Sequence, residues 1–236
     1  MRSSRSGADP LDPGRNGFAH RGLHHGDAFL ENSFAAFAAA LELGAGIECD
    51  LRLTADHEVV VFHDRDATRM CGDPMTIEGS TLAKIGRLQV GGRSIPTLES
   101  LLALVGGHVP LLLEVKIEGD HWRFGPALVR ALGGYRGRFG VMSFDPRLAR
   151  WLKTNAPAIR RGLVVRDNLS RLKRWFAMQL ADPQFLAVDR AALARSWVVR
   201  ARSRLPVYSW TIATADQRRA ALPLADALIW EADGRP

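Results

Sequence analysis

Short apolar runs alternate with amphipathic stretches through almost the whole chain, and this alternation constrains the fold more than any other feature. It is typical of repeated β-α units, which build a parallel sheet covered by helices. Eight of the runs are interpreted as strands: Gly17–His20, Gly46–Leu53, Leu111–Lys116, Arg138–Ser143, Gly162–Val165, Phe185–Val188, Val207–Thr211 and Asp226–Trp230. Eight parallel strands alternating with helices can close into a barrel, and 236 residues fall in the size range of a single one. We therefore predict an α/β fold, a single (β/α)8 TIM barrel.

One element departs from this alternation. Asp50–Thr54 and Val59–His63 are separated by a polar turn, and we expect them to form an extra β-hairpin after the second barrel strand. A two- or four-residue loop places Asp50 directly opposite His63, with both side chains on one face. A three-residue bulged loop shifts the pairing by one and places Cys49 there instead. We prefer the first register because it turns His63 toward the acidic residues discussed below.

The stretch from Asp64 to Pro110 is long for a connection in a compact domain and is punctuated by glycine and proline. Connections of this length are usually functional or carry a small structure of their own. We expect this one to run over the rim of the barrel and to return through a helix at Thr97–Val105.

The first residues differ in composition from the rest. Residues 1–16 are polar and rich in glycine and proline, and we expect a flexible N-terminal arm ahead of one barrel domain at 17–236. The arm lacks the apolar core of a secretory signal, and no run reaches the roughly 18 apolar residues that span a bilayer. Two cysteines, Cys49 and Cys71, are too few for a disulfide framework. We therefore predict a reducing compartment and a cytoplasmic location.

The net charge of +7 is unevenly distributed. Residues 145–204 hold 14 arginines and lysines against four aspartates. The aromatic residues do not interleave with basic ones along one face, as platforms for nucleic-acid strands require. The sequence therefore argues against a nucleic-acid partner.

Within this basic region, the segment Arg171–Met178 mixes basic and aromatic residues. A helix lying on a membrane surface has this composition, so weak contact with a membrane surface stays open. We favour the alternative, an outer helix of the barrel that packs Leu172, Trp175 and Phe176 inward.

Three acidic residues fall at the carboxyl ends of predicted strands, where barrels place function. Glu48 and Asp50 lie two apart and share a face, and Glu114 repeats the pattern on the next strand. Buried carboxylates are costly without a partner. We therefore predict that Glu48, Asp50 and Glu114 together form an all-oxygen site for one divalent cation, Mg²⁺ or Ca²⁺. The alternative is plain ion pairs, Glu114 with Lys116 and Glu48 with Arg52.

Cationic and titratable residues occupy similar positions. His20 ends the first strand and His63 ends the hairpin, and two imidazoles beside an acidic cluster suit a general acid and base near neutral pH. Arg21 and Lys116 supply positive charge for a phosphoryl group. These residue types together indicate phosphate-ester chemistry at the mouth of the barrel.

An ordered series of short motifs narrows this phosphate-ester chemistry to one family. The series is His20-Arg21-Gly22, Glu31-Asn32-Ser33, Glu48-x-Asp50, His63-Asp64, Glu114-x-Lys116, Ser143-Phe144 and Trp210-Thr211. It resembles the glycerophosphodiester phosphodiesterase family over residues 18–236. That family usually has glycine where His57 stands, so we expect His57 to adopt a left-handed conformation.

The resemblance implies a role for each matched position. Glu48, Asp50 and Glu114 match the metal ligands, and His20 and His63 match the general acid and base. Arg21 and Lys116 match phosphate-contacting positions, whereas Trp210, together with Phe144, is assigned to the substrate pocket. Glu31 matches a polar position near the first histidine, and Asn32 beside it is expected to support the site in the same way.

The implied activity is metal-dependent hydrolysis of a small-molecule glycerophosphodiester to glycerol phosphate and an alcohol. Two alternatives remain: a lysophospholipase D or phospholipase C-like enzyme acting on membrane lipids, and an inactive barrel used as a binding protein. The sequence leaves open the head group, the choice between Mg²⁺ and Ca²⁺, the division of labour between the histidines, the nucleophile and the oligomeric state.

Overall fold

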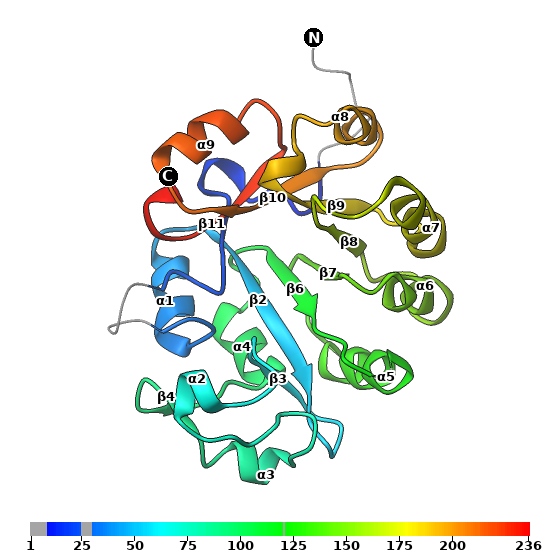
Figure 1. The fold of residues 1–236 in the computed structure, drawn as a ribbon. Helices are drawn as coiled ribbons and strands as arrows, with labels where there is room; N and C mark the ends of the chain where they lie inside the picture. Colours follow the sequence, from blue (N-terminus) through cyan, green and yellow to red (C-terminus); the bar gives the residue numbers. More distant parts are fainter. Residues whose placement is uncertain (1–8, 25–29, 120) are drawn as a thin grey trace.

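The computed structural model describes residues 9–24, 30–119 and 121–236, and within them eight parallel strands close into a ring (Figure 1). The ring runs in the order β1-β2-β6-β7-β8-β9-β10-β11, and β11 pairs with β1 to close it. The strands are β1 (Phe18–Ala19), β2 (Gly46–Leu53), β6 (Leu111–Val115), β7 (Phe139–Ser143), β8 (Arg161–Val165), β9 (Phe185–Asp189), β10 (Val207–Ile212) and β11 (Ala227–Trp230). Each predicted strand is present within two residues at either end, and the predicted TIM barrel is confirmed.

Helices cover the outside of the ring. They are α1 (Phe34–Glu42), α4 (Leu98–Val105), α5 (His121–Ala131), α6 (Pro146–Asn155), α7 (Arg171–Ala181), α8 (Ser196–Arg202) and α9 (Ala215–Ala221). Several begin at a side-chain cap. The Ser33 hydroxyl accepts a hydrogen bond from the Ala36 N–H, and the Asp145 carboxylate caps α6 ahead of a proline. These caps satisfy N–H groups that a first helical turn leaves unpaired.

The hairpin after β2 is present, but its register is not the preferred one. Strand β3 (Val59–Val61) pairs antiparallel with β2 and lies outside the ring, with Leu51 opposite Val61. The expectation that Asp50 lies opposite His63 is therefore wrong. The pairing follows the alternative with the three-residue loop.

The conformation of the turn explains this register. His57 has a φ of +64° and closes a loop of residues 55–57, while the Thr54 N–H donates to the Glu58 carbonyl at 2.9 Å. A three-residue loop that ends in a left-handed residue shifts the pairing by one relative to a two-residue loop. The prediction of a left-handed His57 is confirmed. Because β3 ends at Val61, its pleat does not fix the direction of His63, which still reaches the barrel mouth.

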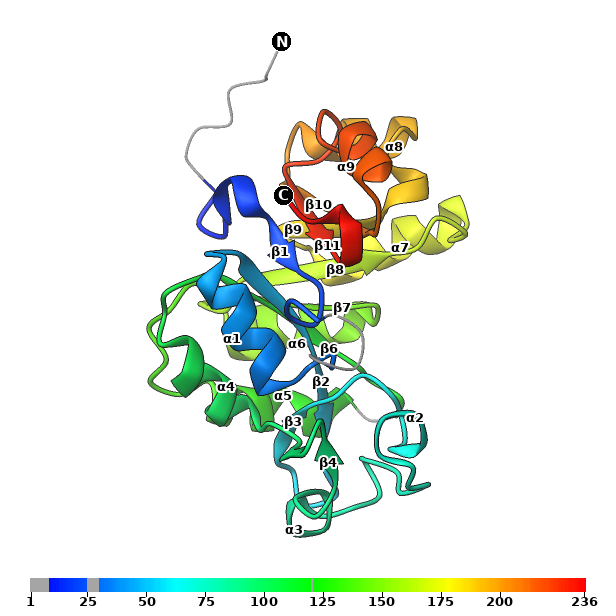
Figure 2. The ribbon, with the colours of Figure 1, turned by 90° about the vertical axis from the view of Figure 1, so that its left-hand side faces the viewer.

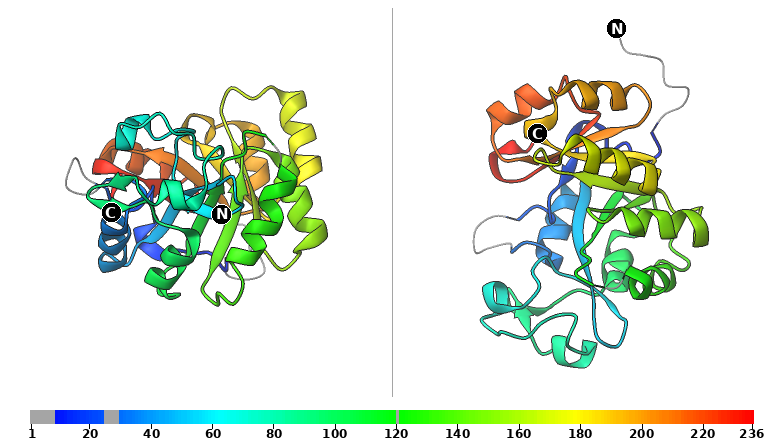
Figure 3. Two further views of the ribbon diagram at one scale, coloured as in Figure 1. Left: turned by 90° about the horizontal axis from the view of Figure 1, so that it is seen from below. Right: turned by 45° about the vertical axis from the view of Figure 1, so that its right-hand side comes forward.

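The segment between the hairpin and α4 builds a small layer of its own at the lower edge of the molecule (Figures 1 and 2, and Figure 3, right). It contains α2 (Thr68–Cys71), α3 (Leu82–Ile85), β4 (Gln89–Val90) and β5 (Arg93–Ser94). Its apolar side chains, among them Phe62, Ile77 and Ile85, form a separate buried cluster against β3. Helix α4 then returns the chain to the barrel, as expected, and buries Leu98, Leu101 and Leu102 against the main core.

The other end of the barrel is closed by the N-terminal segment. Leu11 is buried with Phe18, Phe185 and Tyr208, which lie near the starts of their strands. The Tyr208 hydroxyl donates to the Asp9 carboxylate. Residues 9–16 of the predicted arm thus pack under the barrel, and residues 1–8 lie outside the described part of the chain.

The prediction for α7 is wrong in one respect. This segment is an outer helix of the barrel, but Leu172, Trp175 and Phe176 are exposed rather than packed inward. The helix contacts the core through Ala177, Met178 and Ala181 on its opposite face, and the large side chains are therefore left outside. Among the helices of the described chain, none is long and apolar enough to cross a membrane.

Candidate active site

A cavity of about 410 Å³ opens at the carboxyl ends of the strands. Of the eleven predicted site residues, eight line it: His20, Arg21, Glu48, His63, Glu114, Lys116, Phe144 and Trp210. The other three lie directly behind them: Glu31 and Asp50 bond to Arg21, and Asn32 bonds to Asp50 and through its N–H to the Arg21 carbonyl. The structure therefore brings all eleven residues into one region.

Three carboxylates meet at the floor of this cavity. Strand β2 turns Glu48 and Asp50 inward while Ile47, Cys49 and Leu51 pack outward against the helices, because side chains alternate along a strand. Glu114 lies beside Asp50 in the β2–β6 pairing. One oxygen from each carboxylate lies within 4.8 Å of the others, and all three residues are buried.

Asp50 is the most heavily bonded of the three. Lys116 Nζ lies 2.9 Å from its Oδ1, and Arg21 Nε lies 3.1 Å from its Oδ2. The Asn32 side-chain amide donates to Oδ2 at 2.9 Å and accepts from the Asp50 N–H at 3.3 Å. Lys116 also bonds to Glu114. Asp50 thus anchors both cations that were predicted to contact phosphate.

The backbone around Arg21 is held in an unusual conformation. Arg21 has a φ of +55° and Asn32 one of +54°, values that cost energy for residues other than glycine and that occur at functional sites. The Arg21 N–H donates to Glu48 at 3.1 Å, and the Asn32 N–H donates to the Arg21 carbonyl at 2.9 Å. This geometry aims a backbone donor at the carboxylate cluster.

The carboxyl groups differ sharply in acidity. Burial, together with the charge of Asp50, raises the pKa of Glu48 to about 8. Burial also raises the pKa of Glu114, although Lys116 opposes it. For Asp50 burial acts in the same direction, but Lys116 and Arg21 outweigh it and hold the pKa below its usual range. Without further positive charge, the cluster therefore favours a proton on Glu48.

A divalent cation fits this donor set. Glu48 Oε1 is buried and has no hydrogen-bond partner within the described part of the chain, which is costly for a carboxylate oxygen. Three converging carboxylates offer the hard oxygen ligands that Mg²⁺ and Ca²⁺ prefer. The plain ion pair of Glu114 with Lys116 is present, but Arg52 bonds to Glu118 rather than to Glu48. The ion-pair alternative therefore leaves Glu48 unexplained.

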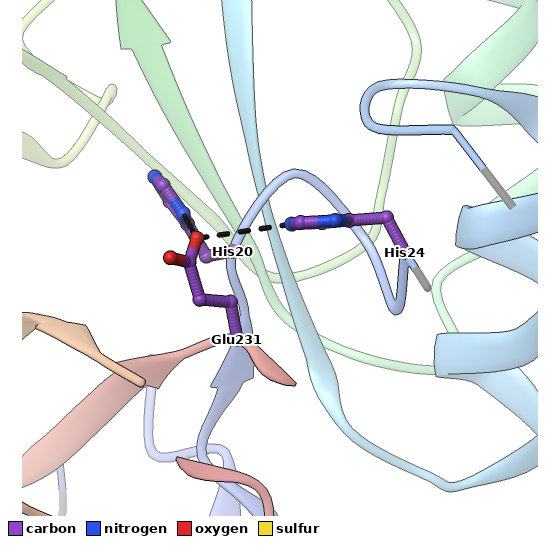
Figure 4. Close-up of side chains that lie close together, drawn as sticks. All are labelled: His20, His24 and Glu231. Atoms are coloured by element: carbon purple, nitrogen blue, oxygen red, sulfur yellow. Dashed lines mark hydrogen bonds and ion pairs between the residues drawn. The ribbon is translucent and has the colours of Figure 1, made fainter. Parts of the chain in front are cut away.

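His20 lies at one side of the carboxylates and bonds to an acid that the sequence analysis did not assign. Its Nδ1 is 2.7 Å from Glu231 Oε2, while its Nε2 is 3.9 Å from Glu48 Oε2. His24 Nε2 approaches the same Glu231 oxygen at 3.8 Å, and Figure 4 shows both rings directed at this carboxylate. Glu231 fixes the ring of His20 so that Nε2 faces the cavity.

His63 flanks the cavity through a second imidazole–carboxylate pair. Its Nδ1 lies 2.7 Å from Asp64 Oδ1, and Arg69 Nε bonds to the other Asp64 oxygen at 2.6 Å. Arg69 also bonds to Glu31, which in turn bonds to Arg21 at 2.9 Å. Glu31 therefore links the two sides of the site rather than touching the cavity itself.

The two histidines are tuned in opposite directions. For His20, burial alone lowers the pKa, but the bond to Glu231 and the charge of Glu48 outweigh it, so the pKa is raised. For His63, burial and the nearby charges of Arg21 and Lys116 lower the pKa below its usual value despite Asp50 and Asp64. Titratable groups whose environments separate their pKa values are suited to acid and base roles.

The remaining wall of the cavity is aromatic. Phe144 and Trp210 meet edge to face with ring centroids 5.7 Å apart, and the Arg166 guanidinium lies 4.5 Å from the Phe144 ring centre. Arg166 and Asp189 also line the cavity. This wall therefore presents two aromatic rings to the cavity, together with one basic residue, Arg166, and one acidic residue, Asp189.

Sequence reasoning missed Glu231, Arg166 and Asp189. A signal for all three was available, because each stands at or just after the carboxyl end of a predicted strand. The partnership of Glu231 with His20 joins the last strand to the first, and such a long-range contact has no local pattern.

The fold and the cavity define a (β/α)8-barrel protein with a charged, aromatic-walled pocket at the mouth, the place where such barrels carry active sites. Comparison with known proteins agrees. Residues 20–230 match the family described as "Glycerophosphoryl diester phosphodiesterase family". The chain belongs to this family, and the family predicted from the sequence is confirmed.

Individual relatives are similar to the chain over different lengths. A glycerophosphodiester phosphodiesterase of Caldanaerobacter subterraneus subsp. tengcongensis is 32% identical over 62% of this chain, and the match spans 66% of that relative's length. The crystal structure of a glycerophosphodiester phosphodiesterase from Parabacteroides distasonis has a TM-score of 0.78 at 22% identity and covers 93% of this chain and 94% of its own. That of an Oleispira antarctica phosphodiesterase, solved with the product sn-glycerol-3-phosphate, has a TM-score of 0.80 at 22% identity, with 92% of both chains covered. These structures support the fold.

Proposed function

We propose that the chain hydrolyses glycerophosphodiesters to glycerol phosphate and an alcohol. The observation that carries the proposal is one cavity in which two imidazoles flank three buried carboxylates beside Arg21 and Lys116. The names of the relatives support the same reaction, as does the glycerol phosphate bound to the Oleispira structure. An inactive barrel accounts less well for two histidines with opposite pKa shifts.

We propose Glu48, Asp50 and Glu114 as ligands of one divalent cation, Mg²⁺ or Ca²⁺. When bound, the cation would polarise a phosphoryl oxygen and offset charge that develops there. The residues around it supply the rest. Arg21 and Lys116 are the proposed contacts of the phosphoryl group. Glu31 bonds to Arg21, and Asn32 bonds to Asp50, which holds both cations. Phe144 and Trp210 provide the wall against which the alcohol part of the substrate packs.

The opposite pKa shifts suggest how the histidines divide the work. With a raised pKa and Glu231 on its Nδ1, His20 is proposed as the general acid that protonates the leaving alkoxide. With a lowered pKa, His63 is proposed as the base that takes the proton of the nucleophile. A base works near neutral pH only while it is unprotonated, and an acid only while it is protonated.

The proposal is tested with a coupled assay for glycerol phosphate release. The substrates are glycerophosphodiesters with choline, ethanolamine and glycerol head groups, and lysolipids are included to represent the alternative of a membrane-lipid phosphodiesterase. Release from the deacylated substrates and not from lysolipids is expected. Turnover of lysolipids alone would favour the alternative, and no turnover with either Mg²⁺ or Ca²⁺ would leave only the binding protein.

Substitution of Glu231 gives a second prediction. Glu231→Gln removes the charge that raises the pKa of His20, so kcat/KM should fall about tenfold, less than on loss of the ring itself. Because His20 must be protonated to act, activity is lost as pH rises through its pKa. The alkaline limb of the pH–rate profile should therefore move to lower pH. Asp233→Asn, an exposed neighbour with the same loss of charge, is the matched control; an unmoved limb in Glu231→Gln contradicts the role.

Cation binding should release a proton. Burial raises the pKa of Glu48 to about 8, so at pH 7 this carboxyl is mostly protonated and must ionise before it can act as a ligand. Affinity for Mg²⁺ or Ca²⁺ should rise about tenfold from pH 6 to pH 7 and level off above about pH 8. Calorimetric titrations in buffers of different ionisation heat measure the proton directly. Glu48→Gln should abolish the release, and a wild-type protein that releases none would refute the ligand assignment.

We propose that the protein is located in the cytoplasm. Cys49 and Cys71 are both free thiols, which fits a reducing compartment. A small-molecule glycerophosphodiester is the proposed partner of the cavity.

A further inference from the structure

Helix α7 exposes a stripe of large apolar side chains. Leu172, Trp175, Phe176 and Leu180 are 65%, 54%, 58% and 40% exposed, and they recur at the spacing that places them on one helical face. The Trp175 and Phe176 rings meet edge to face with centroids 4.8 Å apart. Single exposed apolar residues are ordinary, but a continuous stripe marks an interaction surface.

The stripe belongs to a helix that is firmly seated. Ala177, Met178 and Ala181 pack against the barrel core, and the Ser170 hydroxyl caps the first turn. Rotation of the helix to bury the stripe would expose these residues instead. In Figure 1, α7 lies on the outside of the ring next to α6, with its outer face toward solvent. The apolar face is therefore outward because the opposite face is already occupied.

Positive charge flanks the start of the stripe. Arg171 and Lys173 lie beside Leu172 in the first turn, and both are exposed. Helix α7 contains no acidic residue. The nearest acids along the chain are already bonded, Asp167 to Arg195 and Asp182 to Lys153. The region around the stripe is thus cationic.

The stripe begins close to the mouth of the cavity. Arg166, which follows β8, lines the cavity, and the cap of α7 stands only four residues further along the chain. A surface that binds through Leu172 and Trp175 therefore lies beside the rim rather than at the closed end under Leu11.

We propose that the α7 stripe docks the protein on anionic lipid bilayers. Leu172, Trp175 and Phe176 enter the interfacial layer while Arg171 and Lys173 contact acidic head groups, as interfacial amphipathic helices do. A second copy of this chain is the less suitable occupant, because a twofold contact through this face brings like charges together. Docking would place the cavity mouth beside the lipid surface. Binding to vesicles does not require that the protein catalyses the proposed reaction.

Co-sedimentation of the full chain with vesicles tests the proposal. One set of vesicles is phosphatidylcholine, and the other is phosphatidylcholine and phosphatidylglycerol in equal parts. The protein should bind the mixed vesicles, and raised salt should release it. The double variant Trp175→Ser, Phe176→Ser should bind at least about tenfold more weakly. The double variant Arg171→Gln, Lys173→Gln should lose about twenty-five-fold in vesicle affinity, since each cation near an anionic surface contributes about fivefold.

Matched controls separate docking from general stickiness and from misfolding. Trp122 is 64% exposed on α5, so Trp122→Ser removes an indole that is at least as exposed as that of Trp175. Lys84→Gln with Arg87→Gln removes the same charge from the layer around α3. Both should bind vesicles like the wild type, and all variants should keep the wild-type circular dichroism spectrum. Equal loss in the controls, or wild-type binding in the α7 variants, overturns the proposal. The proposal is also overturned if the wild type is a dimer that binds no vesicles and the double variant Trp175→Ser, Phe176→Ser is a monomer.

Discussion

Chelation with EDTA is expected to abolish release of glycerol phosphate, and Mg²⁺ or Ca²⁺ is expected to restore it. Loss of a cation that offsets developing charge removes several kcal/mol of transition-state stabilisation, so turnover should fall by about a thousandfold or more. The residues left behind cannot replace it. Asp50 and Glu114 engage Lys116, Asp50 also engages Arg21, and Glu48 favours its protonated form.

The measurement is the rate in chelated protein before and after titration with each ion. Circular dichroism of the chelated protein is the control for the fold, because the main barrel core is apolar and does not depend on the ion. Turnover that persists in EDTA would contradict the proposal that the three carboxylates bind a cation required for catalysis. Restoration by one ion and not the other identifies the preferred cation, since Mg²⁺ demands a tighter coordination geometry than Ca²⁺.

The barrel itself was predictable because its strands carry a local signal. Gly46–Leu53 was predicted with the bounds that β2 has, since a run of apolar residues interrupted by inward carboxylates has few other interpretations. The convergence of Glu48, Asp50 and Glu114 followed from the same logic. Residues at the carboxyl ends of neighbouring parallel strands must lie close together once the ring is closed.

The hairpin register and the orientation of α7 could not be settled in this way. The register depended on whether His57 takes a left-handed conformation within a three-residue loop, and sequence alone allowed both loops. In α7 two stripes compete for the core, one with Trp175 and Phe176 and one with Ala177 and Met178. Hydrophobicity favours the first, but the small side chains of Ala177 and Ala181 let the helix sit close to the barrel. Ala177 and Met178 are therefore partly buried against the core, and Ala181 is fully buried.

The role of Glu231 was hidden for a different reason. It lies 211 positions from His20, and its approach depends on closure of the ring between β11 and β1. Pairing of the first and last strands places the residues that follow them side by side. A charged residue after the last strand of a predicted barrel therefore merits attention as a partner for the residue that ends the first.

Replacement of either histidine should lower turnover by about two to four orders of magnitude while the fold stays intact. His20→Ala removes the ring that Glu231 aims at the cavity, and His63→Ala removes the ring that Asp64 holds. His108, exposed in the loop after α4, is the matched control, and His108→Ala should keep the wild-type rate. Wild-type rates in either site variant would refute the assignment.

A change of leaving group separates the two roles. A p-nitrophenyl diester of glycerol phosphate expels a stable phenolate that needs no proton, so the general acid matters little for it, whereas the base is still required. With this substrate His20→Ala should recover most of the lost rate and His63→Ala should recover none. The reverse pattern would exchange the roles of acid and base. Equal recovery in both variants would mean that neither ring acts as the acid. The bond between His20 and Glu231, which raises the pKa of His20, would then be structural only.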